Sequence, residues 1–208
     1  MENCQINRLP IFTQEIFYFQ LPNFNEWKKQ VNQIILVEDN QEVHKHNTTP
    51  KENCNVMAKR TAWNSHERYS SLNLICEEIE KNIKIFIDKE DYDIPDLNVR
   101  NCWLNWYKQN QYAQPHNHQN YLSAILFVDV EKSNSKFFFH SNNNAVFIKK
   151  TDSHTNFSNV KEVSAKDGTV IFFDGSIFHS VSSNTTDNTR ITMAVNFGVD
   201  YSKKRKEY

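Results

Sequence analysis

From Leu97 onward, the sequence is a series of short segments in which apolar and polar residues alternate, and short polar turns separate these segments. A period of two is typical of β-strands, because successive side chains point to opposite faces of a sheet. Many strands without intervening helices indicate a sandwich or barrel and not a βαβ fold. The predicted strands are 97–107, 121–130, 136–140, 145–149, 169–173, 177–182 and 189–197.

The first half of the chain contains one predicted strand and two predicted helices. Residues 14–21 (QEIFYFQL) have the aromatic and β-branched composition of a strand, which Pro22 ends. Two later stretches have apolar residues at helical spacing, and the polar segment 39–55 between them is predicted to be a loop. The apolar positions are Trp27, Val31, Ile34 and Ile35 in the first helix, and Leu72, Ile75, Ile79, Ile83 and Phe86 in the second. We expect these helices to brace a sheet.

The composition fits one packed domain. The chain has 208 residues, with 15 Phe, 8 Tyr and 4 Trp but only 3 Gly, which favours a mainly β (α+β) fold with a large core and excludes a collagen-like chain. We expect a single domain over 1–208, with a strand and supporting helices in 1–96 and the β core in 97–200. The formal net charge of -1 gives no general reason to expect a nucleic-acid or membrane partner.

The four cysteines lie far apart and form no CxxC motif, so neither a zinc knuckle nor a disulfide framework is indicated. The first thirty residues contain no uninterrupted apolar run, which argues against a signal peptide, and no stretch is long enough to span a bilayer. We therefore expect a soluble, cytoplasmic protein with reduced thiols.

Three histidines form the most informative constellation for function. His116 and His118 are two residues apart, so within a strand their imidazoles would lie on one face, and His179 stands in the apolar segment 177–181. Three nitrogens on one face of a metal suit a non-haem iron centre, and they equally suit a catalytic zinc that activates water. The alternative is that surface or turn histidines are close in sequence by chance.

A single arginine, Arg190, is the candidate anion ligand. It shares one face of the last predicted strand with Thr192, Ala194 and Asn196, whereas the other face carries the apolar residues Ile191, Met193, Val195 and Phe197. A guanidinium on a buried face needs an anion, either a bound carboxylate or an internal Asp or Glu. Asn105 and Tyr107 are also two apart, with an amide and a phenol that are able to bind carboxylate oxygens, although such residues are more often ordinary core or cross-strand polar groups.

Residues 106–128 and 167–197 together resemble the 2-oxoglutarate and Fe(II)-dependent oxygenase superfamily, and most closely its 2OG-Fe(II) oxygenase family common in bacteriophage and marine bacteria. The elements that carry the resemblance are His116-Asn117-His118, Leu122-Ser123-Ala124, Gly168-Thr169-Val170, His179-Ser180-Val181 and Arg190-Ile191-Thr192. Their order and spacing are moderately specific, and the likeness covers about half of the chain, from residue 101 onward.

The resemblance implies a double-stranded β-helix, a jelly roll of the cupin type. It also implies that His116 and His179 are iron ligands, that Arg190 binds the distal carboxylate of 2-oxoglutarate, and that Asn105 and Tyr107 contact this cosubstrate. His118 occupies the position of an acidic ligand in the superfamily. Either three histidines suffice here, or water takes that position and turnover is impaired.

The sequence therefore predicts a dioxygenase, specifically a hydroxylase, that uses Fe(II), 2-oxoglutarate and O2. Its proposed metal ligands are His116, His118 and His179. A zinc-dependent hydrolase or lyase with the same histidines, and a catalytically silent β-helix that binds a carboxylate ligand or a partner protein, stay open as alternatives. The prime substrate, whether small molecule, peptide or nucleobase, is not predicted. His140 and His154 are expected in loops or at the surface, because each lacks a partner at metal-ligand spacing.

Overall fold

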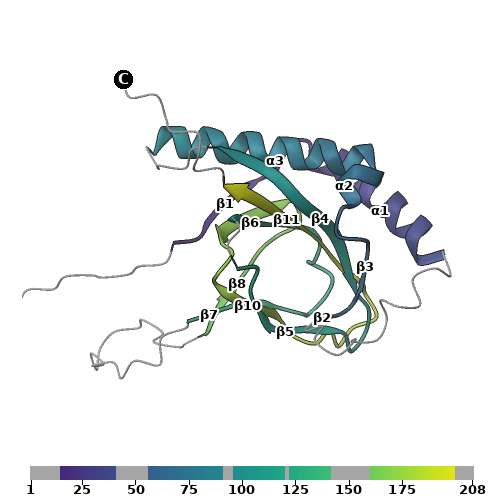
Figure 1. Cartoon of the computed structure of the whole chain (residues 1–208). Coiled ribbons are helices and arrows are strands. Elements are labelled where there is room, and N and C mark those ends of the chain that lie inside the picture. The colour runs from purple at the N-terminus through teal and green to yellow at the C-terminus, as the bar shows by residue number, and fades with distance from the viewer. Residues whose placement is uncertain (1–14, 41–55, 91–95, 120–121, 142–159, 200–208) are drawn as a thin grey trace, which may run out of the picture.

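The structure is a computed structural model that describes residues 15–40, 56–90, 96–119, 122–141 and 160–199. In this part of the chain, helices cover one side of two facing β-sheets (Figure 1). The helices are α1 (Phe24–Asn40), α2 (Ser65–Arg68) and α3 (Ser70–Lys89). The strands are β1 (Phe17–Gln20), β2 (Val56–Met57), β3 (Lys59–Arg60), β4 (Leu97–Tyr107), β5 (Tyr112–His116), β6 (Leu122–Asp129), β7 (Phe137–His140), β8 (Val160–Val163), β9 (Thr169–Asp174), β10 (Phe178–Val181) and β11 (Arg190–Val199).

The two sheets have the connectivity of a double-stranded β-helix. The larger sheet has the strand order β1-β9-β6-β11-β4-β3, and the smaller has the order β2-β5-β10-β7-β8. Among the described strands from β4 onward, successive strands alternate between the sheets, except that β7 and β8 both belong to the smaller one. The strands pair antiparallel throughout, as in β4 with β11 and β5 with β10. The predicted mainly β, jelly-roll fold class is therefore confirmed.

Alternation along β11 separates the core into two parts. Ile191, Met193, Val195 and Phe197 join a cluster beneath the helices, whereas Arg190 points to the other face of the sheet. A second cluster, which includes Phe127, Phe137, Phe139 and Phe173, fills the space between the sheets. The separation of apolar and polar residues that the sequence predicts for the last strand is therefore confirmed.

The helix α3 is held on the larger sheet by the predicted apolar stripe. Leu72, Ile75, Ile79 and Ile83 are completely buried there, and Phe86 is half-buried. Burying each of these aliphatic side chains stabilises the fold by roughly 1.5 to 3 kcal/mol relative to exposure. The helices thus brace the outer face of the sheet and leave the inner face for the site.

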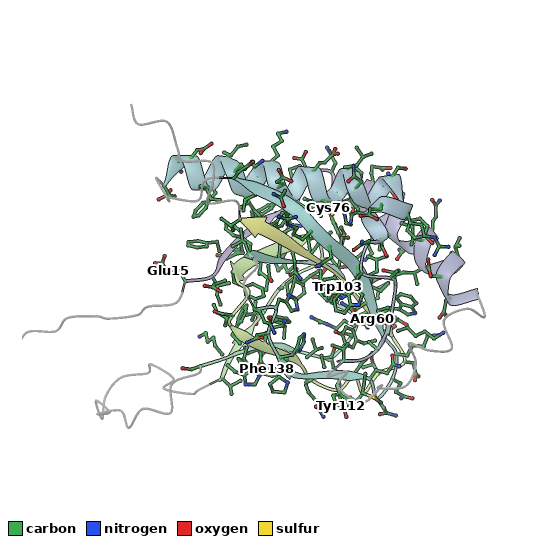
Figure 2. The ribbon with its side chains drawn as sticks, viewed as in Figure 1. Glu15, Arg60, Cys76, Trp103, Tyr112 and Phe138 are labelled. Carbon is green, nitrogen blue, oxygen red and sulfur yellow. The ribbon has the colours of Figure 1, made fainter. Side chains whose placement is uncertain are left out.

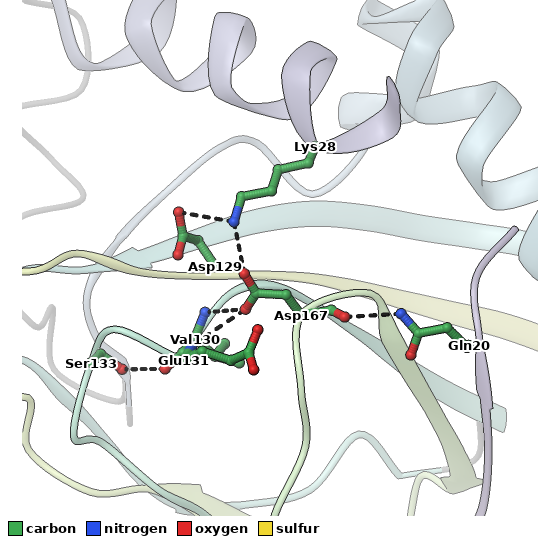
Figure 3. A network of polar contacts seen from close by, with 7 residues as sticks. All are labelled: Gln20, Lys28, Asp129, Val130, Glu131, Ser133 and Asp167. Carbon is green, nitrogen blue, oxygen red and sulfur yellow. Dashed lines mark hydrogen bonds and ion pairs between the residues drawn. The ribbon is translucent and has the colours of Figure 1, made fainter. Parts of the chain in front are cut away.

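A polar cluster ties α1 to the turn after β6 (Figure 3). Lys28 contacts Asp129 at 3.2 Å and Asp167 at 2.7 Å, and the other carboxylate oxygen of Asp167 accepts a hydrogen bond of 2.8 Å from the backbone N–H of Val130. The Gln20 side chain donates to the backbone oxygen of Asp167 at 2.9 Å. These contacts join β1, α1 and the segment before β9.

Most of the predicted elements agree with the structure, and the differences have local causes. The helix α1 continues to Asn40, past the predicted boundary at residue 39. Strands β2, β3, β5 and β8 were not predicted, because two of them are only two residues long, β5 contains Pro115, and the VKEV sequence of β8 lacks an apolar alternation. The predicted strand 145–149 lies outside the described residues, as does His154.

Two of the four cysteines fall in the described part, namely Cys76 of α3 (Figure 2) and Cys102 of β4, and both are free and buried. No described helix is long and apolar enough to cross a membrane.

Candidate metal centre

Three histidines from two strands and one loop converge at the inner face of the smaller sheet. His116 is the last residue of β5, and His179 is its direct partner on β10. The ring of His116 lies 4.4 Å from that of His179 and 5.5 Å from that of His118, and the rings of His118 and His179 are 4.8 Å apart. One nitrogen of each ring lies within 4.8 Å of the others, a spacing at which one ion could contact all three.

The route by which His118 reaches this cluster differs from the expectation. A shared strand face was predicted for His116 and His118, but β5 ends at His116 and His118 lies two residues beyond it. The backbone N–H of His118 donates to the oxygen of Gly175 at 2.7 Å, which fixes this loop against the turn before β10. The grouping is thus as predicted, but a loop and not a strand produces it.

Each ring uses its Nδ1 atom for a contact away from the cluster. His116 Nδ1 lies 2.7 Å from the backbone oxygen of Gln114, and His179 Nδ1 lies 3.1 Å from that of Ile177. A carbonyl oxygen only accepts, so these two Nδ1 atoms carry the proton. His118 Nδ1 lies 2.9 Å from Asn196 Oδ1. In each ring the Nε2 atom is left for the cluster, which is the arrangement of a metal-binding histidine with an outer hydrogen bond.

The environment favours neutral imidazoles. Burial is the main cause that lowers the pKa of all three histidines, that of His118 to about 4. The mutual repulsion of positive charges further lowers the pKa of His118 and of His179. Neutral nitrogen is the form that binds a metal, so these rings need no deprotonation near pH 7.

Aromatic side chains surround the cluster. Phe137 stacks on His179 at 5.6 Å, Phe173 meets the same ring edge-on at 5.3 Å, and Trp103 lies 5.5 Å from His118. Trp103 lies on the face of β4 opposite Cys102, on the side away from the helices (Figure 2). Such walls limit the access of water to His179, which is buried, whereas His116 and His118 are partly exposed.

Arg190 is buried without a carboxylate partner. It is 3% exposed, its Nη1 donates to the backbone oxygen of Ser135 at 3.0 Å, and its Nε has no hydrogen-bond partner. Burial lowers the pKa of this guanidinium to about 10. No described Asp or Glu forms an ion pair with it, so the internal ion pair considered from the sequence is not found in this part of the chain.

The other candidate residues lie beside Arg190 on two neighbouring strands. Tyr107 of β4 is the direct cross-strand partner of Arg190, and Asn105 is that of Thr192. All four side chains are buried, and Asn105 Oδ1 has no hydrogen-bond partner. The structure thus brings the four predicted residues together in two adjacent pairs on the inner face of the larger sheet.

Two phenylalanines connect Arg190 with the histidines. The guanidinium carbon lies 5.4 Å from the Phe127 ring, Phe127 lies 5.8 Å from Phe137, and Phe137 stacks on His179. Arg190 also lines a pocket of about 310 Å³ with Phe127, Phe137 and Ser135. A ligand that reaches from the histidines to Arg190 would therefore pass an apolar wall.

Sequence reasoning missed a group of polar residues behind His118. Asn196, Ser123 and Asn101 form hydrogen bonds in a row, and Asn196 and Ser123 are buried. Alternation along β11 already placed Asn196 on the face of Arg190, so the pattern contained a signal for it. His140 lies outside the cluster, where its Nε2 contacts Ser180 Oγ at 2.7 Å.

Residues 101–196 match the family model described as "Putative 2OG-Fe(II) oxygenase". None of the curated proteins compared with the chain matches it. The match begins within β4 and ends within β11, and it includes the three histidines, Arg190 and Asn196.

Solved structures with a similar fold include a prolyl-4-hydroxylase from Pseudomonas putida, with a TM-score of 0.59, 10% identity, and coverage of 90% of this chain and 94% of that one. A prolyl hydroxylase from Trichoplax adhaerens, in complex with a peptide of hypoxia inducible factor, has a TM-score of 0.59, 10% identity, and coverage of 92% and 86%. HygX from Streptomyces hygroscopicus, with nickel and 2-oxoglutarate bound, has a TM-score of 0.57, 11% identity, and coverage of 94% and 87%.

At these identities the structures show a common fold, and the family match adds the enzyme class. The fold, the grouped histidines and the match over residues 101–196 agree with one another. The match assigns residues 101–196 to the 2-oxoglutarate and Fe(II)-dependent oxygenases, enzymes that use Fe(II), 2-oxoglutarate and O2.

Proposed function

We propose that the protein is a hydroxylase whose Fe(II) is held by the Nε2 atoms of His116, His118 and His179. The observation that carries this proposal is the outward hydrogen bond at each Nδ1, because it directs three neutral Nε2 lone pairs to one point. Three imidazoles on one side of an ion leave positions for cosubstrate and oxygen, as non-haem iron enzymes require. His118 thus replaces the usual acidic ligand as a ligand itself.

The cosubstrate is 2-oxoglutarate, and we assign its distal carboxylate to Arg190. The unpartnered Nε of this buried cation supports the assignment, since a carboxylate could accept from it and offset the cost of burial. Thr192, Asn105 and Tyr107 lie next to Arg190 and would orient the same carboxylate through a hydroxyl, an amide and a phenol. The carbon chain would lie along Phe127 and Phe137.

When bound, Fe(II) supplies the oxygen activation that is coupled to decarboxylation of 2-oxoglutarate. The residues of this chain bind and orient the reactants and exclude water, and the reaction requires no protein nucleophile. The aromatic wall of Phe137, Phe139 and Phe173 would keep the site dry on one side of His179. The substrate provides the C–H bond that is hydroxylated, and it is a small molecule, a peptide or a nucleobase.

We further propose that residues 1–208 form one domain. The support is that the helices and the site share the larger sheet. The helices α1 and α3 pack on its outer face, and Arg190 lies on its inner face. The apolar cluster beneath the helices takes its residues from both parts, so neither part completes that cluster alone.

Anaerobic titration tests the proposal. The Fe(II)-loaded protein should develop a visible charge-transfer band on addition of 2-oxoglutarate, because the cosubstrate binds the metal through two oxygens. The Zn(II)-loaded protein serves as the control and should show no band. If Fe(II) binds but no band develops at saturating 2-oxoglutarate, the assignment of the cosubstrate fails. If the purified protein binds no divalent metal, the whole proposal fails.

A further inference from the structure

We propose that Asn196 is a positioning residue that holds His118 with its Nε2 atom toward the metal, and that Asn101 sets the orientation of the Asn196 amide. This inference rests on the proposed metal site. It assigns a role to two residues that do not contact the metal themselves.

His118 differs from the other two histidines in what orients its ring. His116 and His179 each donate to a backbone oxygen two residues earlier in the chain, so the local backbone fixes their tautomer. His118 lies in the loop after β5 and contacts side chains of the opposite sheet, namely Asn196 of β11 and Ser123 of β6. Its orientation therefore depends on side chains 78 and 5 residues away in sequence.

The contacts of Asn196 determine which of its atoms faces the imidazole. Asn196 Nδ2 donates to Asn101 Oδ1 at 2.9 Å, which leaves Oδ1 to accept from His118 Nδ1 at 2.9 Å. The Ser123 hydroxyl donates to the same Oδ1 at 2.8 Å. With the amide turned around, its N–H groups would face the His118 N–H, and the hydrogen bond would be lost. Asn101 and Asn196 are neighbours across β4 and β11, so the sheet holds both.

The choice of an amide has an electrostatic consequence. An acceptor oxygen behind a metal-binding histidine fixes the ring and raises its basicity, and a carboxylate in that position would add a negative charge. Asn196 is 4% exposed and Ser123 is completely buried, so an unpaired charge there would be costly. The amide orients His118 while it keeps the site neutral.

Metal titration of the apo protein is the first test. Co(II) serves as the probe, since its visible absorption reports both affinity and coordination. Asn196→Leu should weaken Co(II) binding by about 10- to 100-fold, and Asn196→Asp, which keeps an acceptor oxygen, should bind Co(II) at least as tightly as the wild type. Asn98→Leu is the matched control, because this amide also lies on β4 but opposite Gly198, and it should bind as the wild type does.

The tautomer of His118 in the metal-free protein is the second test, and it applies even if Asn196→Leu folds poorly. Nitrogen NMR of the histidine rings should find the proton of His118 on Nδ1 in the wild type and in Asn196→Asp. A proton on Nε2 in the wild type would overturn the proposal. So would unchanged Co(II) affinity in Asn196→Leu, or equal losses in Asn196→Leu and Asn196→Asp.

These outcomes are distinguishable from failure of the metal site itself. If wild-type protein, His116→Ala and His179→Ala all bind Co(II) equally, the three histidines are not the ligands, and the proposed function fails. If those two variants lose Co(II) while Asn196→Leu keeps it, the metal site stands and only the role of Asn196 is overturned.

Discussion

Arg190 at the start of β11 lies directly across from Tyr107 at the end of β4, on the inner face of the larger sheet. The two residues are 83 positions apart in the chain, yet the register of the strands makes them neighbours, and both are buried. The guanidinium of Arg190 and the phenol of Tyr107 therefore lie side by side, and Asn196 lies further along the same strand as Arg190.

Replacing Arg190 should weaken cosubstrate binding. Arg190→Ala removes the charge-assisted partner of a buried carboxylate, and we expect a loss of about 2 to 5 kcal/mol in the binding free energy of 2-oxoglutarate. Calorimetry on metal-loaded protein measures the loss. Arg100→Ala is the control, because Arg100 is an exposed residue of β4, and it should bind normally. Unchanged affinity in Arg190→Ala would assign the arginine a purely structural role.

Tyr107→Phe should have a much smaller effect than Arg190→Ala. It removes one hydroxyl next to the cosubstrate, and one hydrogen bond is worth about 0.5 to 1.5 kcal/mol, which corresponds to roughly twofold to tenfold. The measurement is the rate of succinate formation from 2-oxoglutarate with iron and oxygen but without prime substrate. Arg190→Ala should nearly abolish this rate. A loss in Tyr107→Phe as large as that in Arg190→Ala would contradict the proposed division of roles.

Removal of any one of the three histidines should reduce metal affinity strongly. His116→Ala, His118→Ala and His179→Ala each delete one Nε2 ligand, whereas His140→Ala removes a ring outside the cluster and should leave the affinity unchanged. Equilibrium dialysis with Fe(II) under anaerobic conditions gives the comparison. If His118→Ala retains as much iron as the wild type, His118 is not a direct ligand of the metal. His118→Asp supplies the acidic ligand of the superfamily and should retain iron.

The metal-free protein should become less stable as the pH falls from about 6.5 to 4. Burial lowers the pKa of His118 to about 4 and that of His179 well below the ordinary value of 6.5, so between these values the unfolded chain binds more protons than the folded one. The stabilising contribution is complete above pH 6.5 and is lost toward pH 4. Urea unfolding at pH 7.5 and at pH 5 measures this contribution as a difference in the free energy of unfolding. The difference between the two pH values should be smaller in His179→Leu than in the wild type. Equal stability of the wild type at both values would refute the prediction.

Gly168→Ala should destabilise the fold without involving the site. Gly168 has φ of 82°, and a Cβ atom there would lie 2.2 Å from Gln20 Nε2 and 2.7 Å from the Phe24 ring. A non-glycine residue in this backbone region costs about 1 to 3 kcal/mol, which thermal unfolding would detect as a lower Tm. Lys166→Ala, an exposed change two residues away, is the control and should leave the Tm nearly unchanged.

The sequence by itself determined the elements and the two faces of the last strand. The period-two pattern predicted β4 from residue 97 to residue 107, as the structure has it, and the helical spacing of Leu72, Ile75, Ile79 and Ile83 predicted α3. These predictions succeed because apolar residues that pack against a core recur at the period of the local backbone, about every second residue in a strand and about every 3.6 residues in a helix. Short or exposed strands such as β2 and β8 have no such pattern, and the sequence did not predict them.

Only the tertiary structure decided how distant residues meet. His116 and His118 were grouped by their spacing, but the loop after β5 and its contact with Gly175 bring His118 to His179. The pairing of Arg190 with Tyr107 and the hydrogen bond from His118 to Asn196 depend on strand register and on which sheet faces which. Local periodicity predicts which face of the sheet a side chain occupies. The residue that it contacts on another strand depends on the pairing of strands that are far apart in the chain.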